Sequence, residues 1–280
     1  MSTQRTITRL VRGLPATDGA GVKLTRVLGT QALPEVDPFL MLDEFRSDDP
    51  QAYIAGFPDH PHRGFETITY MLAGRMRHKD SRGNEGLLGP GDVQWMTTAR
   101  GLVHSEMPEQ EDGLMQGFQL WLNLPAREKM LDPRYQDVPA DTIPVIRHAD
   151  AWVKLLAGQY QGQTGPIQSP TTKPFIADVS LDGGAALNLP VPEGHAGFAY
   201  VFDGEVTING QDSSMAVARG QAAVLTEGAE LPLTGGIDGA RVLVVLGQPL
   251  KEPIARHGPF VMNTPQEIYQ AFADYQAGRF

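Results

Sequence analysis

The sequence predicts an all-β protein built from two strand-rich units. Its 280 residues exceed the usual size of one domain, and each half is long enough to bury a core. Gly and Pro are frequent, with 31 and 22 residues, and short apolar runs alternate with tight-turn residues along the chain. Because no regular helical pattern separates these runs, we expect a barrel or a sandwich and not a parallel α/β sheet.

The first unit contains a series of predicted strands. They are runs of apolar, Thr and Tyr residues at 64–74, 93–97, 102–107 and 115–124. Compact turns separate them, at Arg82-Gly83-Asn84 and at Gly89-Pro90-Gly91-Asp92. The segment 125–134, rich in Ala, Arg, Glu, Lys and Met, predicts a short helix that closes this unit. We therefore place the first domain at residues 1–135.

The second unit repeats the strand pattern. Its predicted strands lie at 153–157, 175–181, 197–209, 222–225 and 241–246. Gly204 follows Asp203 in a turn much as Gly74 follows Ala73, which indicates a duplicated β unit. We place this domain at residues 136–280 and expect it to lack a metal site.

A helix at 264–277 is predicted at the end of the second domain. Thr264 supplies an N-cap, Pro265 suits the first helical position and Glu267 completes a capping box. Gly278 stands where a C-cap belongs. Apolar residues recur at helical spacing in this segment, and we interpret their stripe as a face that packs on a barrel without a catalytic role.

Composition excludes several classes of function. The chain has 23 basic and 33 acidic residues, a net charge of −10, so direct nucleic-acid binding is not expected. It has no cysteine, which excludes disulfides, zinc fingers and thiol nucleophiles and leaves nitrogen and oxygen as metal ligands. The first residues lack the apolar core of a signal peptide, and no apolar stretch is long enough to span a bilayer. We expect a cytoplasmic protein with no membrane partner.

Two short motifs in the first unit carry metal-ligating side chains. In His60-Pro61-His62 both imidazoles lie on one side of an extended segment, because side chains alternate along a strand and Pro61 disfavours helix. His104 and Glu106 repeat this spacing. Either pair can arise by chance, but two such pairs on facing strands supply three nitrogens and one carboxylate to a single ion. Two positions of an octahedral site then stay open.

Several longer segments resemble the pirin family. They are GFPDHPHRGFET at 56–67, PGDVQWMT at 90–97 and HSEMP at 104–108. Similar matches lie at 37–40, 119–124, 202–205 and 258–264. The resemblance covers most of the chain and implies two tandem cupin barrels of the jelly-roll type.

The resemblance also implies an iron(II) site in the N-terminal barrel, with His60, His62, His104 and Glu106 as ligands. Manganese, nickel, copper, cobalt and zinc remain alternatives, because affinity order alone does not favour iron. The general cupin pattern places a further glutamate after the first motif, where Thr67 stands here. Glu66, one residue earlier, is therefore an alternative or fifth ligand.

Four further residues match family positions near the metal. We expect Phe57, Arg63 and Gln119 to contact substrate and Asp43 to orient a ligand histidine. Of the remaining histidines, His78 lies between Arg77 and Lys79 on a hairpin that we expect to be exposed and solvated.

His195 has no second ligand beside it in the sequence. We interpret it as structural or as part of the surface.

The resemblance supplies a substrate class. Several bacterial pirins resemble quercetin 2,3-dioxygenases, also described as flavonol 2,4-dioxygenases, which open the central ring of a flavonol with O₂ and release carbon monoxide. The expected partners are then a small phenolic substrate and O₂, with Glu106 accepting the proton of the flavonol 3-hydroxyl. The alternative is a metal-dependent, redox-sensing regulatory protein that binds a protein partner, as eukaryotic pirins do, without significant turnover.

Overall fold

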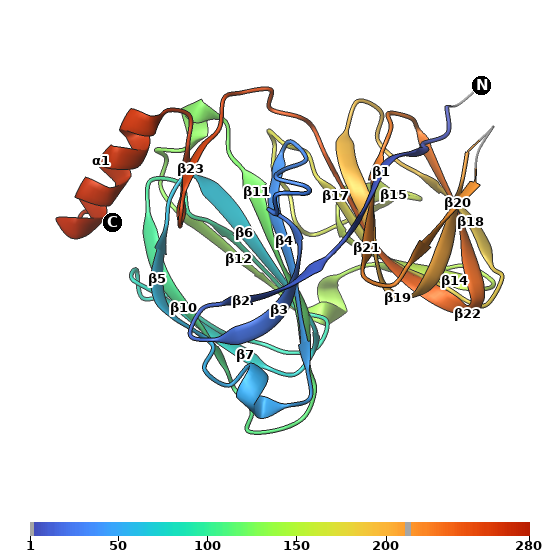
Figure 1. The fold of residues 1–280 in the computed structure, drawn as a ribbon, viewed down its shortest axis with the longest axis horizontal. Helices are drawn as coiled ribbons and strands as arrows, with labels where there is room; N and C mark the ends of the chain where they lie inside the picture. Colours follow the sequence, from blue (N-terminus) through green and yellow to red (C-terminus); the bar gives the residue numbers. More distant parts are fainter. Residues whose placement is uncertain (1–2, 211–213) are drawn as a thin grey trace. The chain divides into compact units, whose positions relative to one another are not determined.

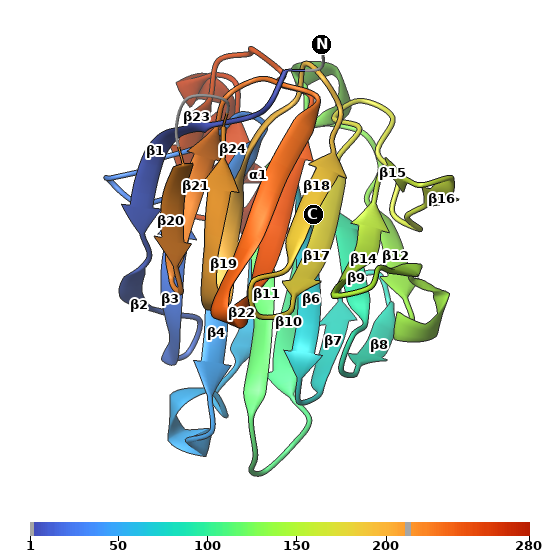
Figure 2. The same cartoon turned by 90° about the vertical axis from the view of Figure 1, so that its right-hand side faces the viewer.

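The computed structural model describes residues 3–210 and 214–280, and strands dominate this part of the chain (Figures 1 and 2). The prediction of an all-β fold is confirmed. Met1 and Ser2, which begin the segment considered above for a signal peptide, lie outside the described residues. No helix within the two described ranges is long and apolar enough to cross a bilayer.

The first barrel carries both histidine motifs and consists of a seven-stranded sheet, a four-stranded sheet and a small hairpin. In sheet order, the large sheet contains β12 (Arg134–Val138), β9 (Val93–Thr97), β6 (Phe65–Ala73), β11 (Met115–Asn123), β4 (Phe39–Ser47), β3 (Val22–Leu28) and β2 (Leu14–Asp18). The smaller sheet contains β5 (Phe57–His62), β10 (Leu102–Pro108), β7 (Met76–Asp80) and β8 (Glu85–Leu88). The hairpin is β23 (Ala255–His257) and β24 (Phe260–Met262). The four strands expected in this unit therefore correspond to β6, β9, β10 and β11.

The second barrel is formed by one nine-stranded sheet and a two-stranded hairpin. Its main path is β1 (Ile7–Arg12), β21 (Gln221–Leu225), β19 (Ala196–Asn209), β22 (Glu230–Gly247), β17 (Phe175–Leu181), β14 (Ala151–Ala157) and β13 (Val145–Arg147). Off this path, β18 (Ala186–Pro190) pairs with β22 and β20 (Ser214–Ala218) pairs with β19. The hairpin is β15 (Gln159–Tyr160) and β16 (Gln163–Thr164).

The N-terminal segment belongs to the second barrel and the C-terminal segment belongs to the first. This corrects the expected domains 1–135 and 136–280. The first barrel comprises Leu14–Arg26, Phe39–Ala140 and Leu250–Phe280, and the second comprises Met1–Gly13, Val27–Pro38 and Asp141–Pro249. The expected boundary lies close to the junction of Ala140 and Asp141. However, β1 pairs with β21, so the first strand belongs to the second barrel. Pairing between segments about 200 residues apart leaves no local signal in the sequence.

The helix expected at 125–134 is also corrected. Only a single 3₁₀ turn forms there, η2 (Ala126–Glu128), and β12 starts at Arg134. Pro133 disfavours helical backbone at Asp132, so a helix that continues to residue 134 is not favoured. Two other 3₁₀ turns are η1 (Pro50–Ala52) and η3 (Ala140–Thr142).

The C-terminal helix α1 (Pro265–Gln276) matches its prediction closely. The Thr264 side chain accepts from the backbone N–H of Glu267, whose carboxylate accepts from the backbone N–H of Thr264, so the capping box is complete. Its buried face includes Ile268 and packs against residues of β24. The helix therefore joins the first barrel and not, as expected, the second.

The interiors of the two barrels differ. The second is filled by one continuous apolar cluster of buried Val, Leu, Ile, Ala and aromatic side chains. The first holds smaller apolar clusters, among them one around Phe45, Met71 and Met115 and one around Phe65 and Trp121. Buried His, Glu, Gln and Thr side chains of the same barrel lie outside these clusters. A polar interior is costly unless its groups are satisfied, so it marks the first barrel as the one that carries a site.

Candidate metal centre

Strands β5 and β10 bring the two sequence motifs together. They pair antiparallel with His60 directly opposite His104, and a register shift follows before Glu106. Strand β5 lies at the edge of its sheet, where Pro61 is tolerated because one side of the strand needs no ladder hydrogen bonds. The spacing of two residues in each motif then directs both pairs of side chains to one face.

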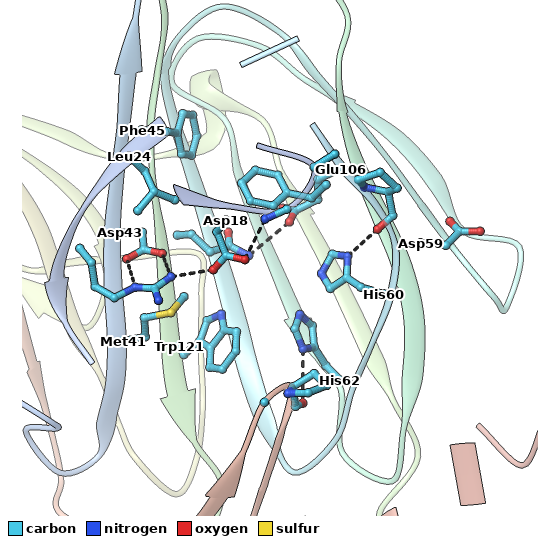
Figure 3. A pocket seen from close by; sticks show the side chains of 18 of the residues that line it. Asp18, Leu24, Met41, Asp43, Phe45, Asp59, His60, His62, Glu106 and Trp121 are labelled. Carbon is cyan, nitrogen blue, oxygen red and sulfur yellow. Dashed lines mark hydrogen bonds and ion pairs between the residues drawn. The ribbon is translucent and has the colours of Figure 1, made fainter. Parts of the chain in front are cut away.

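Three histidines converge in this region. Ligand nitrogens of His60, His62 and His104 all lie within 4.8 Å of one another. His62 and His104 are buried, while His60 is partly exposed. Figure 3 shows His60 and His62 at the pocket. Within residues 3–210 and 214–280, no other group of three or more His, Cys, Asp or Glu side chains meets this spacing. The three imidazoles can hold one metal ion.

Hydrogen bonds set the orientation of two of the rings. Nδ1 of His60 lies 2.8 Å from the carbonyl oxygen of Pro58, and Nδ1 of His62 lies 3.4 Å from that of Pro259. A carbonyl oxygen only accepts, so Nδ1 carries the proton and Nε2 keeps its lone pair for a ligand bond. Partners of this kind commonly orient metal-binding histidines.

His104 supplies the test of whether a metal fits. Both of its ring nitrogens are buried, and neither has a hydrogen-bond partner among the described residues. Burial, followed by the neighbouring histidines, lowers the pKa values of His62 and His104 well below the usual value. Both rings are therefore neutral at pH 7. An unpaired, neutral imidazole next to two others fits a metal ligand and is costly without one.

Glu106 lines the same pocket but lies outside the group of nitrogens within 4.8 Å. Its Oε1 accepts a 2.9 Å hydrogen bond from Thr69 Oγ1, and its Oε2 accepts one of 3.4 Å from Gln119 Nε2. The side chain is buried, and burial raises its pKa, against the opposing charge of His60. The structure thus provides a buried, basic carboxylate beside the histidines. That Glu106 is the fourth ligand stays a prediction.

The pocket in front of these groups has a volume of about 720 Å³. Polar side chains line the pocket at the histidines and around Asp18 and Asp43 (Figure 3), and apolar and aromatic side chains form much of the rest of its lining, among them Leu24, Phe45, Phe57, Met76 and Trp121. The edge of His62 faces Trp121 with 5.1 Å between ring centroids. A cavity of this size and character suits a small aromatic ligand.

A row of polar side chains crosses the large sheet beside the pocket. In register order it runs Asp43, Gln119, Thr69, Gln94 and Asp137, over strands β4, β11, β6, β9 and β12. Direct partners in antiparallel strands share one face, so these side chains lie on the same side of the sheet. Neither polar atom of the buried Gln94 amide has a hydrogen-bond partner among the described residues. Thr69 and Gln119 link this row to Glu106.

Comparison with known proteins agrees with this geometry. The pirin family pattern matches residues 21–122, and that of the pirin C-terminal cupin domain matches residues 176–280. The chain belongs to the pirin family. It is 48% identical to a pirin-like protein of Caulobacter vibrioides, over 99% of both chains. It is 38% identical to human pirin, over 99% of this chain and 94% of the relative.

A solved structure extends the comparison to the fold. The crystal structure of a quercetin 2,3-dioxygenase from Acinetobacter baumannii superposes with a TM-score of 0.91 at 33% identity, covering 99% of each chain. The two barrels of the chain are accordingly cupin barrels, as the resemblance implied.

Three of the four residues expected near the metal, Phe57, Gln119 and Asp43, line the pocket. Phe57 forms part of its wall, and Gln119 reaches Glu106. Arg63 was expected there as well, but it points elsewhere. Its guanidinium donates to the Arg100 carbonyl oxygen and to Asp274 of α1, and it is absent from the pocket lining. Side chains alternate along the chain, so the residue after His62 faces away from the site.

Asp43 reaches the pocket but does not contact a ligand histidine. Both of its carboxylate oxygens accept hydrogen bonds from Arg26, at 2.9 and 2.7 Å. The expectation that Asp43 orients a histidine is therefore wrong, and Asp43 orients Arg26. The backbone carbonyls of Pro58 and Pro259 take the role expected of it.

The alternative ligand Glu66 is directed away from the histidines. It is fully buried, accepts a 2.6 Å hydrogen bond from Thr97 and lies one position away from Phe65 and Thr67 on β6. Phe65 packs against His62, so the opposite face of the strand carries Glu66.

His195 lies in the second barrel, where its two ring nitrogens contact the carbonyl oxygens of Glu193 and Lys173. This agrees with the structural interpretation.

His78 is the residue that sequence reasoning missed. It is buried, not solvated, and its Nδ1 is 2.7 Å from the hydroxyl oxygen of Tyr135. Its Nε2 lies 3.3 Å from Asp137, and β7 places it directly across from Glu106 on β10. The alternation of Met76, His78 and Asp80 along β7 was the available signal, because all three are buried and the residues between them are not.

Proposed function

We propose that the chain is a mononuclear non-heme metal dioxygenase that acts on a flavonol such as quercetin. The observation that carries this proposal is the convergence of His60, His62 and His104 beside a pocket that is lined by the first two of them, by a buried carboxylate and by an aromatic wall. The similarity to the Acinetobacter baumannii protein, which is named for the same reaction, supports it at 33% identity. The products expected are the ring-opened ester and carbon monoxide, with consumption of one O₂.

The residues that would hold the metal are the three histidines, with Glu106 as the fourth ligand. We propose iron(II), with manganese, nickel, copper, cobalt or zinc as substitutes set by supply. When bound, the ion supplies Lewis acidity toward the paired oxygens of the flavonol and an electron route to O₂.

Glu106 acts as the base in this proposal. Burial raises its pKa, so the carboxylate is a stronger base than one in water and can accept the proton of the 3-hydroxyl. Thr69 and Gln119 hold its two oxygens in place by hydrogen bonds of 2.9 and 3.4 Å. The aromatic wall binds the flat rings and limits access of water.

Gas and absorbance measurements on the iron-loaded protein test the proposal. We expect O₂ uptake with quercetin, loss of the visible absorption band of the flavonol, and carbon monoxide release above a free-iron control. Glu106→Gln should lower the rate about 100-fold or more at equal metal content. Glu109→Gln is the matched control, because Glu109 lies on the outside of the barrel in an ion pair with Arg77.

Two results would contradict the enzyme proposal. One is no carbon monoxide above the free-iron control, and the other is equal activity in the wild type and the His60→Ala, His62→Ala double variant. Either would favour the alternative, a metal-dependent regulatory protein that binds a protein partner.

A further inference from the structure

A charged cluster lies on the pocket wall away from the histidines (Figure 3). Arg26 is its centre: Nε and Nη2 donate to the two oxygens of Asp43, and Nη2 also donates to Asp18 at 2.7 Å. Asp43 is almost fully buried, with 3% of its side chain exposed, while Asp18 is half exposed at the rim. The cluster is thus anchored at one end and open to the pocket at the other.

A hydrogen-bond donor and a hydrogen-bond acceptor both remain available in this cluster. Arg26 Nη1 donates to no described residue, although its side chain is only 24% exposed. The Asp18 carboxylate accepts from Arg26 and from the backbone N–H of Gly19, and each of its oxygens has a further lone pair. A ligand group that both accepts and donates a hydrogen bond would satisfy the two sides together.

The charge of the cluster decides which ligand group fits. Two carboxylates and one guanidinium give a net charge of −1, and including Arg256 on the same wall gives zero. A carboxylate or phosphate would therefore meet no net positive charge here. A neutral hydroxyl group accepts from Arg26 and donates to Asp18 without adding charge.

The distance across the sheet from the Glu106 side of the pocket to the cluster matches the length of an aromatic ligand with more than one ring. Gln119, which contacts Glu106, is the register partner of Asp43 on the next strand, and Arg26 lies one strand further on β3. Two inter-strand spacings amount to about 10 Å. Trp121 and Phe57 line the same pocket and offer flat apolar surface to a ring. A ring held by its oxygens at the histidines can carry a second ring as far as Arg26.

We propose that Asp18, Arg26 and Asp43 form a subsite that binds the phenolic hydroxyl groups on the fused ring of the flavonol. This inference rests on the proposed function and narrows its substrate class from flavonols in general to polyhydroxylated ones. Arg26 and Asp18 contact the hydroxyl groups, and Asp43 positions Arg26. An unsubstituted ring would leave Arg26 Nη1 and the further lone pairs of Asp18 to water.

Binding titrations with two flavonols test the subsite. Galangin and 3-hydroxyflavone share the chelating 3-hydroxy-4-oxo edge, but only galangin carries hydroxyl groups on the fused ring. We expect the metal-loaded wild type to bind galangin about tenfold more tightly, a change typical of one or two hydrogen bonds. Asp18→Asn and Arg26→Lys should each bring the ratio of the two Kd values close to one, with the Kd of 3-hydroxyflavone unchanged. Asp48→Asn, an exposed substitution outside the pocket, is the matched control.

The outcomes separate this inference from the proposed function. Equal Kd values for the two flavonols in the wild type, or a ratio that neither variant changes, would overturn the subsite while leaving flavonol oxidation in place. If neither flavonol binds and neither is oxidised, the proposed function falls and the subsite falls with it. Thermal unfolding of each variant is recorded in parallel, and the half-exposed Asp18 provides a result even if Arg26→Lys lowers stability.

Discussion

Arg63, the residue that directly follows His62, forms a 2.7 Å ion pair with Asp274 of the C-terminal helix. Only 3% of the Arg63 side chain is exposed, and its guanidinium also stacks on the ring of Phe280 at 4.4 Å. The helix is thus attached to the strand that carries two of the histidines. Removal of one partner from a buried pair leaves the other charge unpaired, which costs more than the pair itself contributes.

Asp274→Asn should therefore lower the free energy of unfolding by about 2–4 kcal/mol at pH 7. Hydrogen bonds from Arg63 and Arg279 lower the pKa of Asp274 to about 2, below its unfolded value. A depressed carboxyl pKa stabilises the fold above the unfolded pKa and loses this effect as the pH falls toward the folded pKa. Urea unfolding should show the difference from wild type shrinking between pH 4 and pH 2. Asp112→Asn, an exposed substitution, should show neither effect.

Lys129 should make the free energy of unfolding depend on pH in the neutral to alkaline range, where Asp274 does not titrate. Its Nζ donates to the carbonyl oxygens of Gly64 and Val261 and to Asn123 Oδ1, and burial lowers its pKa to about 7. Between pH 7 and about 10 the unfolded chain binds the proton and the folded chain does not, so unfolding free energy rises with pH. The free energy of unfolding of the wild type should rise over this range, relative to that of Lys129→Met, by up to about 1.4 kcal/mol per pH unit.

Chemical unfolding at pH 7, 8 and 9 measures that slope. Lys23→Met is the control, because Lys23 is exposed and its removal should leave the slope unchanged. Parallel pH profiles for wild type and Lys129→Met would show that Lys129 keeps its proton in the fold.

Substitution of Gly86, which lies against His78, tests the packing around this histidine. A Cβ on Gly86 would lie 2.2 Å from His78 Nε2, whereas a Cβ on Gly89 would meet its nearest neighbour at 3.5 Å. Gly86→Ala must therefore displace His78 from its place between Tyr135 and Asp137. We expect Gly86→Ala to lower the free energy of unfolding by about 1–3 kcal/mol, as at other overpacked sites. Gly89→Ala should keep the free energy of unfolding within about 0.5 kcal/mol of the wild-type value. Similar melting of the two variants would mean that His78 has room to move.

Metal content tests the histidine group without reference to activity. Elemental analysis should find about one ion per chain in the wild type and in His195→Ala, and a loss of most of it in His104→Ala. Full-length variants are required, because the crossing of the chain ends gives neither half of the sequence a complete barrel. Retention of metal by His104→Ala would show that the ligand set is wrong.

Local sequence chemistry was enough for much of this protein. The runs of apolar and Thr residues in β6, β9 and β11 predict buried strands, and Thr264 with Glu267 predicts the start of α1, because each signal lies within a few neighbouring residues. The spacing within each histidine motif likewise fixes two side chains on one face of a strand. The family resemblance then joined the two motifs into one site.

Tertiary structure alone decided what surrounds that site. Arg63, which follows His62, meets Asp274 across 211 positions of the chain. His78 is buried because β12 brings Tyr135 over it, and Asp43 is occupied because β3 places Arg26 beside it. Strand periodicity states that a side chain faces inward but not which strand lies opposite, since pairing depends on contacts between distant segments that no local pattern encodes.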